Sequence, residues 1–320
     1  MTQIRQGILS GADYLSLPRD HETYLLRPLI PTSGAAIIYG DSKVGKTYMG
    51  LQLALALAGQ APEWLGFPVG RSGRVVYLQL DTPGLMWSER LKALRREGLP
   101  IESLFYADRE TLEFYPFDIL HPQHAAYLRT LLQDLHPTVV FMDTIREAHS
   151  GDEDSSTIMR NVIANLVAAT TPAALILISH ARKPSQDQGN NLMADNRGSS
   201  YVVGRMDAII RLTKRHLYYT GRSIEEGSIK LERGDNGLWT AVQDESSEQL
   251  ARVVADTQLK TMRAKARVLA PLIHKSEEAA MSAIRRYVEA QKGRFHQTSK
   301  ELDPNVWIEE DESSPTVTLD

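Results

Sequence analysis

Apolar and polar residues alternate along residues 23–242 in blocks that predict strands and helices in turn. Short and nearly uninterrupted apolar runs predict buried strands at 35–39, 74–80, 103–106, 138–142 and 174–178. Between these runs, apolar residues recur at helical spacing, which predicts helices at 48–58, 85–97, 123–135 and 158–169. Strands that alternate with helices favour an α/β fold, in which a mainly parallel sheet is covered on both faces.

Segments rich in glycine and proline complete this pattern. Residues 59–73 contain Pro62, Gly66, Pro68 and Gly70, and we expect them to form a loop. Glycine turns also separate four later strand-like runs, which would extend the sheet as an edge of hairpins at 207–212, 217–220, 228–232 and 238–242.

The composition changes beyond this sheet. The polar and acidic stretch 243–249 indicates a boundary, which divides the chain into a core at 1–245 and a C-terminal part at 246–320. Residues 257–300 have a helical pattern and contain ten Lys or Arg against three Glu, whereas residues 301–320 contain seven Asp or Glu and no basic residue. We expect a small basic helical segment with a disordered acidic tail.

Composition and charge exclude some classes of protein. The net charge of −4 predicts no general attraction to nucleic acid, so any such contact must be local. Because the chain has no cysteine, disulfides, zinc–thiolate sites and a thiol nucleophile are excluded. The first residues lack the apolar core of a signal peptide, and no apolar run is long enough to span a membrane. We expect a cytoplasmic protein without a membrane partner.

A phosphate-binding motif stands between the first strand and the first long helix. Residues 40–47 read G-x-x-x-x-G-K-T, the pattern of a P-loop, in which backbone N–H groups and the start of the following helix hold phosphate oxygens. Lys46 would reach the β- and γ-phosphates of ATP, and the Thr47 hydroxyl would ligate Mg²⁺. The alternative is a chance match in a glycine-containing turn. The residues expected to bind the nucleotide are Gly40, Asp41, Ser42, Lys43, Val44, Gly45, Lys46, Thr47 and Tyr48.

Three further polar residues follow predicted strands, at the edge where open α/β sheets place their ligands. Asp143 is a candidate ligand of the Mg²⁺ shell, or alternatively a turn or capping residue. Asp81 is expected to end the strand next to the P-loop strand and to polarise the attacking water, or alternatively to start a turn. His180 could sense the γ-phosphate or contact DNA, or simply form a hydrogen bond.

Two basic features lie farther along the chain. The long polar stretch 181–196 and its surroundings contain Arg182, Lys183 and Arg197, which we expect to bind DNA unless the stretch is a disordered surface insertion. The loop after Asp143 is a poor DNA contact, because residues 152–154 are all acidic. Arg222 lies in a glycine-flanked turn and becomes functional only if a neighbouring subunit's nucleotide is close.

The ordered set of these motifs resembles the RecA-like ring ATPase family, close to the plasmid replicative helicase RepA and more distantly the DnaB-type helicases. The resemblance covers residues 20–242 and rests on five segments: 40–47, 77–81, 143–146, 179–183 and 197–200. It implies a RecA-like P-loop core that uses ATP and Mg²⁺. It further implies a homo-oligomeric ring, expected to be a hexamer, that moves on single-stranded DNA with other replication or recombination proteins as further partners.

The resemblance also implies roles for single residues. Lys46, Asp81, Asp143, His180 and Arg222 would be catalytic, with Thr47 and Asp143 holding the metal and Arg222 completing a neighbour's site. Two residues depart from the family pattern. Asp81 stands where the family usually has Glu, and Thr220 stands where DnaB-type members often have Lys. Two other functions remain open, a DNA-binding recombination or loading protein that does not unwind, and a nucleotide-switched protein that never touches DNA.

Overall fold

We describe the protein from a computed structural model. It describes residues 10–16, 23–95, 101–181, 200–222, 224–242, 253–254, 262–273, 276–290, 295–297 and 308–310. The chain divides into two compact units, Met1–Ala241 and Val242–Asp320.

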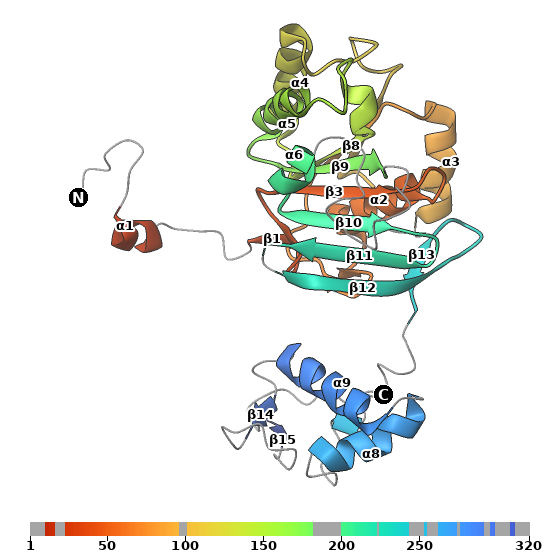
Figure 1. Cartoon of the computed structure of the whole chain (residues 1–320). Helices are drawn as coiled ribbons and strands as arrows, with labels where there is room; N and C mark the ends of the chain where they lie inside the picture. The colour runs from red at the N-terminus through yellow and green to blue at the C-terminus, as the bar shows by residue number, and fades with distance from the viewer. Residues whose placement is uncertain are drawn as a thin grey trace. The chain divides into compact units, whose positions relative to one another are not determined.

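A nine-stranded sheet forms the centre of the first unit, in the order β13-β12-β11-β10-β3-β9-β8-β6-β7 (Figure 1). The strands from β10 to β7 run parallel, and β11, β12 and β13 continue the sheet as antiparallel hairpins. The parallel strands are β3 Ala35–Gly40, β6 Val75–Gln79, β7 Leu104–Asp108, β8 Val139–Asp143, β9 Ala174–His180 and β10 Ala208–Leu212. The antiparallel strands are β11 His216–Gly221, β12 Ile224–Arg233 and β13 Trp239–Ala241. The predicted α/β architecture and its hairpin edge are confirmed.

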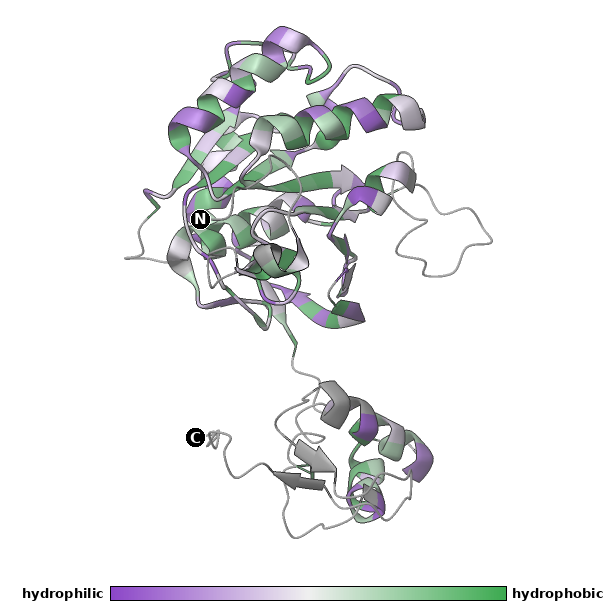
Figure 2. Ribbon diagram, turned by 90° about the vertical axis from the view of Figure 1, so that its left-hand side faces the viewer, coloured by the Kyte–Doolittle hydropathy of each residue, from purple (hydrophilic) through white to green (hydrophobic). Residues whose placement is uncertain are grey.

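Helices cover both faces of this sheet because its central strands are apolar on both sides (Figure 2). Along β3, Ala36 and Ile38 face one core and Ala35, Ile37 and Tyr39 face the other. The helices α2 Lys46–Leu55 and α3 Gly84–Leu94 pack into the first core. The helices α4 Pro122–Leu135, α5 Ser156–Thr170 and α6 Ser200–Arg205 lie together over the second core (Figure 1).

Several connections contain more structure than the sequence pattern predicts. Helix α2 continues into a π-helical turn at Ala56–Gln60, and the 3₁₀ turn Ile145–Ala148 follows β8. Residues 59–73, predicted as a loop, contain the two-stranded pair β4 Glu63–Trp64 and β5 Phe67–Pro68. Trp64 and Phe67 are buried, which explains why this short pair forms. Near the start of the chain lie α1 Gly11–Ser16 and the pair β1 Tyr24–Leu26 and β2 Ile30–Pro31.

The described residues of the second unit include two longer helices and a strand pair. They are α8 Met262–Leu272, α9 Glu277–Ala290, β14 Phe295–Gln297 and β15 Ile308–Glu310, with β14 antiparallel to β15. The strand β15 lies inside the segment predicted as a disordered acidic tail, so that prediction is wrong for residues 308–310. None of the helices among the described residues is long and apolar enough to cross a membrane.

Candidate nucleotide-binding site

The P-loop connects β3 to α2 in the predicted strand–loop–helix arrangement, and two of its residues have left-handed backbone. Lys43 has φ 63°, and Gly45, directly before α2, has φ 103°. A Cβ atom at Gly45 would also lie 3.1 Å from the Trp239 ring and 3.3 Å from the Arg233 guanidinium. Only glycine fits this backbone and this space without strain, so the motif's second glycine is explained by geometry.

The Lys46 side chain is buried and lies over the loop that it follows. Its Nζ donates to the Gly40 carbonyl oxygen at 3.0 Å and to the Asp41 carbonyl oxygen at 2.9 Å. The same Nζ lies 3.1 Å from Nδ1 of His180. Because a charged ammonium can only donate, Nδ1 of His180 is the acceptor. The P-loop lysine and His180, predicted from separate motifs, are therefore in direct contact.

Strand pairing explains why His180 reaches the P-loop. β9 lies directly beside β3, and His180 is paired with Gly40 in the register of the two strands. The backbone continues the ladder, since Ala181 N donates to the Gly40 carbonyl oxygen at 2.9 Å. His180 thus ends the strand adjacent to the P-loop strand, which is the place that we had expected Asp81 to occupy.

Asp143 ends β8 and is almost wholly buried, with 1% of its surface exposed. Burial raises the pKa of its carboxyl group, hydrogen bonds from Tyr77, Thr47 and Gln79 oppose that rise, and the nearby charge of Asp81 adds to it. The bonds from Tyr77 Oη and Gln79 Nε2 both reach Oδ2, at 2.8 and 3.0 Å. The Thr47 hydroxyl, Asp143 and Asp81 therefore share one edge of the sheet.

The position of Asp81 differs from the prediction. Asp81 follows β6, and the strands β8 and β9 lie between β6 and the P-loop strand. The prediction of adjacency is therefore wrong, because the order of strands along the chain is not their order in the sheet. Asp81 still lies at the carboxyl edge, is exposed, and acts on Asp143 through its charge.

Gln79, which the sequence pattern shows only as a strand residue, joins the two acids. Its Nε2 donates to Asp143, while its Oε1 accepts from the backbone N–H groups of Asp81 and Thr82 at 3.1 and 3.2 Å. One fully buried amide therefore fixes the Asp143 carboxylate and the start of the turn that carries Asp81. Tyr77 supports the same carboxylate, and its ring stacks on Phe141 with centroids 5.2 Å apart.

The hairpin between β12 and β13 forms one wall beside the P-loop, which the sequence analysis did not predict. The Arg233 guanidinium lies 4.5 Å from the centroid of the Tyr48 ring. The side-chain amide of Gln52, on α2, donates to the Trp239 carbonyl oxygen at 2.8 Å and accepts from the Trp239 backbone N–H at 2.9 Å. This pair of hydrogen bonds fixes the position of β13 against α2. Arg233, on the neighbouring strand, is therefore held next to Gly45.

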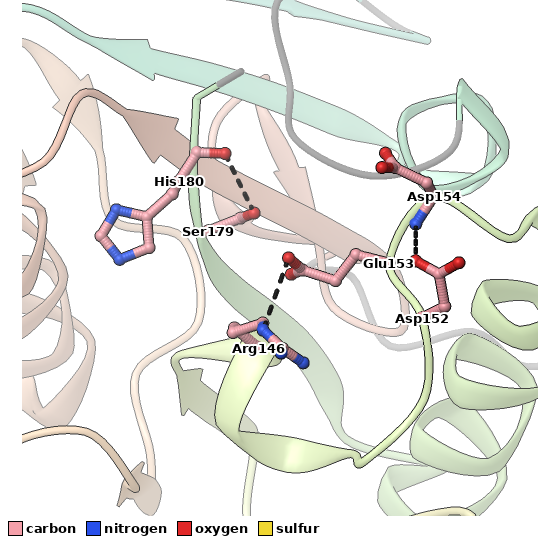
Figure 3. Close-up of polar contacts among 6 residues, drawn as sticks. All are labelled: Arg146, Asp152, Glu153, Asp154, Ser179 and His180. Carbon is pink, nitrogen blue, oxygen red and sulfur yellow. Dashed lines mark hydrogen bonds and ion pairs between the residues drawn. The ribbon is translucent and has the colours of Figure 1, made fainter. Parts of the chain in front are cut away.

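Two acids of the loop after Asp143 are held by contacts within that loop. Glu153 forms an ion pair with Arg146, with 3.6 Å between Oε2 and Nε, and the backbone N–H of Asp154 donates to Asp152 at 2.9 Å. Figure 3 shows Glu153 reaching toward Arg146, with the His180 ring directed away from this pair. The carboxylates of Asp152 and Glu153 are thus engaged within the loop.

Arg222 lies at the opposite edge of the sheet. β11 runs antiparallel to β10, so Arg222, which follows β11, is next to Asp207 at the start of β10. Its Nε is 2.9 Å from the Asp207 carboxylate, and that carboxylate also accepts from the backbone N–H of Ala35 at the start of β3. The length of β3, roughly 3.3 Å per residue, separates Arg222 from its own P-loop.

The remaining predicted site residues are the DNA-binding candidates Arg182, Lys183 and Arg197. They lie outside the described residues, since residues 182–199 are not described.

The donor set at the P-loop fits a magnesium ion. The Thr47 hydroxyl and the Asp143 carboxylate are hard oxygen donors, and Mg²⁺ is commonly held by one or two carboxylates together with substrate phosphates and water. Within the described part of the chain, no group of three or more acidic or histidine residues forms a separate metal site. Burial raises the pKa of Asp143, and a cation bound at this place would lower it again.

One family model matches more than half of this chain, and solved structures are similar to it. Residues 8–186 match the family model AAA_25, described as AAA domain. Among solved structures, a KaiC-like protein from Pyrococcus horikoshii is 12% identical with TM-score 0.47, covering 71% of this chain and 100% of that chain. The ATPase domain of G40P is 14% identical with TM-score 0.49, covering 66% of this chain and 86% of that chain. No curated protein matches the sequence.

Proposed function

The chain belongs to the AAA domain family, and on this premise we propose that it is a RecA-like ring ATPase that moves on single-stranded DNA. The observation that carries the ATPase part is the meeting of Lys46, His180 and the Thr47–Asp143 pair at one edge of the sheet. In P-loop NTPases the P-loop lysine contacts the phosphates, and the P-loop Ser/Thr with an aspartate holds the magnesium ion.

Each residue of this edge then has a task toward ATP. The Lys46 ammonium, now bonded to carbonyl oxygens of its own loop, turns to the β- and γ-phosphates and stabilises charge in the transition state. His180, in contact with Lys46, would sense whether the γ-phosphate is present. Asp81 orients the attacking water as general base. Thr47 and Asp143 would hold Mg²⁺, which would neutralise charge on the phosphates.

The ring and the DNA belong to the same proposal. Arg222 lies too far from its own P-loop to act there, which supports a role at the nucleotide of a neighbouring subunit. The basic residues Arg182, Lys183 and Arg197 would contact the DNA backbone. Because the chain as a whole is acidic, DNA would be attracted only to such local basic residues. More specifically, we propose that the protein is a replicative DNA helicase similar to RepA.

Strand displacement separates the helicase from its alternative, an ATP-dependent loading or recombination protein. A forked duplex with one labelled strand is incubated with the protein, ATP and Mg²⁺. A helicase releases the labelled strand only when ATP can be hydrolysed, and Lys46→Ala abolishes release. ATP hydrolysis that single-stranded DNA stimulates, without any release from forks of either polarity, would contradict unwinding and favour the alternative.

A further inference from the structure

One arginine contacts both the helix that follows the P-loop and the turn that carries Asp81. Arg90 lies on α3 and is partly buried. Its guanidinium is 5.5 Å from the centroid of the Tyr48 ring, in the first turn of α2, which is within the range of a cation–π attraction. Its Nη1 donates to the Thr82 hydroxyl at 3.3 Å, and Thr82 directly follows Asp81. A single side chain therefore connects α2 to the turn of the expected general base.

The packing of α3 explains why Arg90 reaches both partners. The helix begins directly after the turn, where the Trp87 backbone N–H donates to the Pro83 carbonyl oxygen at 3.3 Å. The Trp87 side chain is buried, and its ring stacks on Tyr106 with centroids 3.9 Å apart. Residues three apart lie on the same side of a helix, so Arg90 shares the inner side of α3 with Trp87. This anchor leaves the guanidinium between the first turn of α2 and the Asp81 turn.

The Tyr48 ring is itself held in place by the hairpin of β12 and β13. The Arg233 guanidinium lies 4.5 Å from the ring centroid. At Gly237, an added Cβ would lie 2.2 Å from Cε1 of Tyr48, so the backbone of the hairpin packs directly against the ring. Because both neighbours restrict the ring, it is a fixed point to which Arg90 can attach.

The other end of the connection is Thr82, which is buried. The backbone N–H groups of Asp81 and Thr82 both donate to Oε1 of Gln79. Gln79 therefore fixes the main chain of the turn from β6, and Arg90 fixes the Thr82 side chain from α3. Asp81, in contrast, is exposed. An exposed side chain on a turn keeps a constant position only if the turn is held by the residues around it.

The charge of Arg90 also acts on the tyrosine that supports Asp143. Burial raises the pKa of Tyr77, the Asp143 carboxylate adds to that rise, and the positive charge of Arg90 opposes it. Tyr77 Oη donates to Asp143 at 2.8 Å. Arg90 thus lies among the groups that hold both acids of the site, and its cation is not simply a solvated surface charge.

We propose that Arg90 is a positioning residue for ATP hydrolysis, which holds the Asp81 turn at a fixed distance from the P-loop by joining Thr82 to Tyr48. The inference rests on the proposed function, in which Asp81 orients the attacking water. Arg90 acts through Asp81 and does not need to contact the nucleotide. Loss of Arg90 should therefore slow the chemical step without weakening ATP binding, and it should cost no more than loss of Asp81 itself.

The test compares kcat for ATP hydrolysis with the Kd for a fluorescent ATP analogue in the full chain. Arg90→Gln removes the guanidinium, and Thr82→Val removes the hydroxyl that accepts from it while keeping the shape of the side chain. The two changes are measured singly and together, and Arg90→Gln is also combined with Asp81→Asn. The matched control is Arg95→Gln, the same change at an exposed arginine directly after α3. Thermal unfolding shows whether each variant remains folded.

We expect Arg90→Gln to lower kcat about tenfold or more, since a misplacement of about 1 Å can cost about a hundredfold. Thr82→Val should lower kcat as well, and the Kd of both variants should stay within about twofold of wild type. Because both changes break the same connection, the double variant should be no slower than Arg90→Gln alone, within about twofold. Adding Arg90→Gln to Asp81→Asn should likewise slow hydrolysis by no more than about twofold. Arg95→Gln should keep the wild-type kcat.

Several results would overturn the positioning role alone. They are a wild-type kcat in Arg90→Gln, losses that multiply in either double variant, and a Kd that rises about tenfold while kcat is unchanged, which would make Arg90 a nucleotide-binding residue. A wild-type kcat in Asp81→Asn, or a wild-type protein that does not hydrolyse ATP, would instead contradict the proposed function and overturn the inference with it.

Discussion

At the scale of single residues, the site depends on groups that hold the expected catalytic residues in place. Lys46, Asp143 and His180 are each recognisable from a motif, whereas Gln79 and Tyr77 are not. Gln79 has one amide that donates to Asp143 and accepts from the turn of Asp81. It is a positioning residue, because it touches the carboxylate that would hold the metal shell and does not face the nucleotide itself.

Gln79→Glu tests this positioning role. The change keeps the acceptor for Asp81 and Thr82 but removes the donor to Asp143 and adds negative charge beside it, so the Asp143 carboxyl binds its proton more tightly. We expect ATPase activity to fall about 10- to 100-fold, the typical cost of losing a partner of a metal ligand. Excess Mg²⁺ should recover part of the loss in a magnesium titration.

The control is Gln123→Glu, the same substitution at an exposed position of α4. It should leave both the rate and its magnesium dependence unchanged. If Gln79→Glu loses activity with no change in magnesium dependence, the residue supports the fold alone and the positioning role is wrong.

The sequence predicts single residues better than their neighbours in space. The P-loop spacing identifies Lys46 and Thr47 directly, because all the residues of this motif are neighbours along the chain. Asp81 was expected beside the P-loop strand, and the sheet places β8 and β9 between them, since strand order depends on crossover connections that a local pattern does not record. Arg233 was missed for the same reason, because its contact with Tyr48 joins residues that are distant along the chain.

At the scale of elements, the hairpin of β12 and β13 packs directly beside the P-loop. Gln52 fixes β13 to α2 through two hydrogen bonds, and the Arg233 guanidinium stands over Tyr48 beside Gly45. At Gly237, in the same hairpin, φ is 85° and an added Cβ would lie 2.2 Å from the Tyr48 ring. The hairpin therefore packs closely on the first turn of α2.

Arg233→Ala is expected to weaken ATP binding more than it slows the chemical step. The guanidinium is a fixed positive charge at the entrance of the P-loop, and hydrogen bonds to charged groups contribute about 1.5–3 kcal/mol. We predict that the Kd for a fluorescent ATP analogue rises at least tenfold. Lys230→Ala, an exposed cation on the same strand, is the control and should bind normally. Equal Kd values for the two variants would contradict the role of the hairpin.

At the scale of the whole molecule, the proposed ring would bring together opposite edges of one sheet to complete each ATP site. The P-loop lies at the carboxyl edge of β3, and Arg222 lies at the amino edge, paired with Asp207. An arginine that completes a neighbour's site is worth about 10³–10⁵ in rate in related phosphoryl-transfer enzymes. We expect Arg222→Ala to bind ATP normally and to hydrolyse it about a thousandfold more slowly.

Dependence on protein concentration tests whether Arg222 acts between subunits. ATPase rate per subunit should rise as oligomers form, in parallel with mass measured in solution. Mixing Arg222→Ala with Lys46→Ala subunits should restore some activity, because one type of interface then has both residues intact. A dilute monomer that hydrolyses ATP at the full assembled rate would exclude a role in trans.

The central claim is that this P-loop site hydrolyses ATP and that single-stranded DNA drives the hydrolysis. The most direct measurement is the steady-state ATPase rate of the wild-type protein and of Lys46→Ala, each with and without single-stranded DNA. We predict that DNA stimulates the wild-type rate at least severalfold, and that Lys46→Ala is about 10²–10³-fold slower with or without DNA. A wild-type rate that DNA does not change, or a Lys46→Ala rate equal to wild type, would contradict the account.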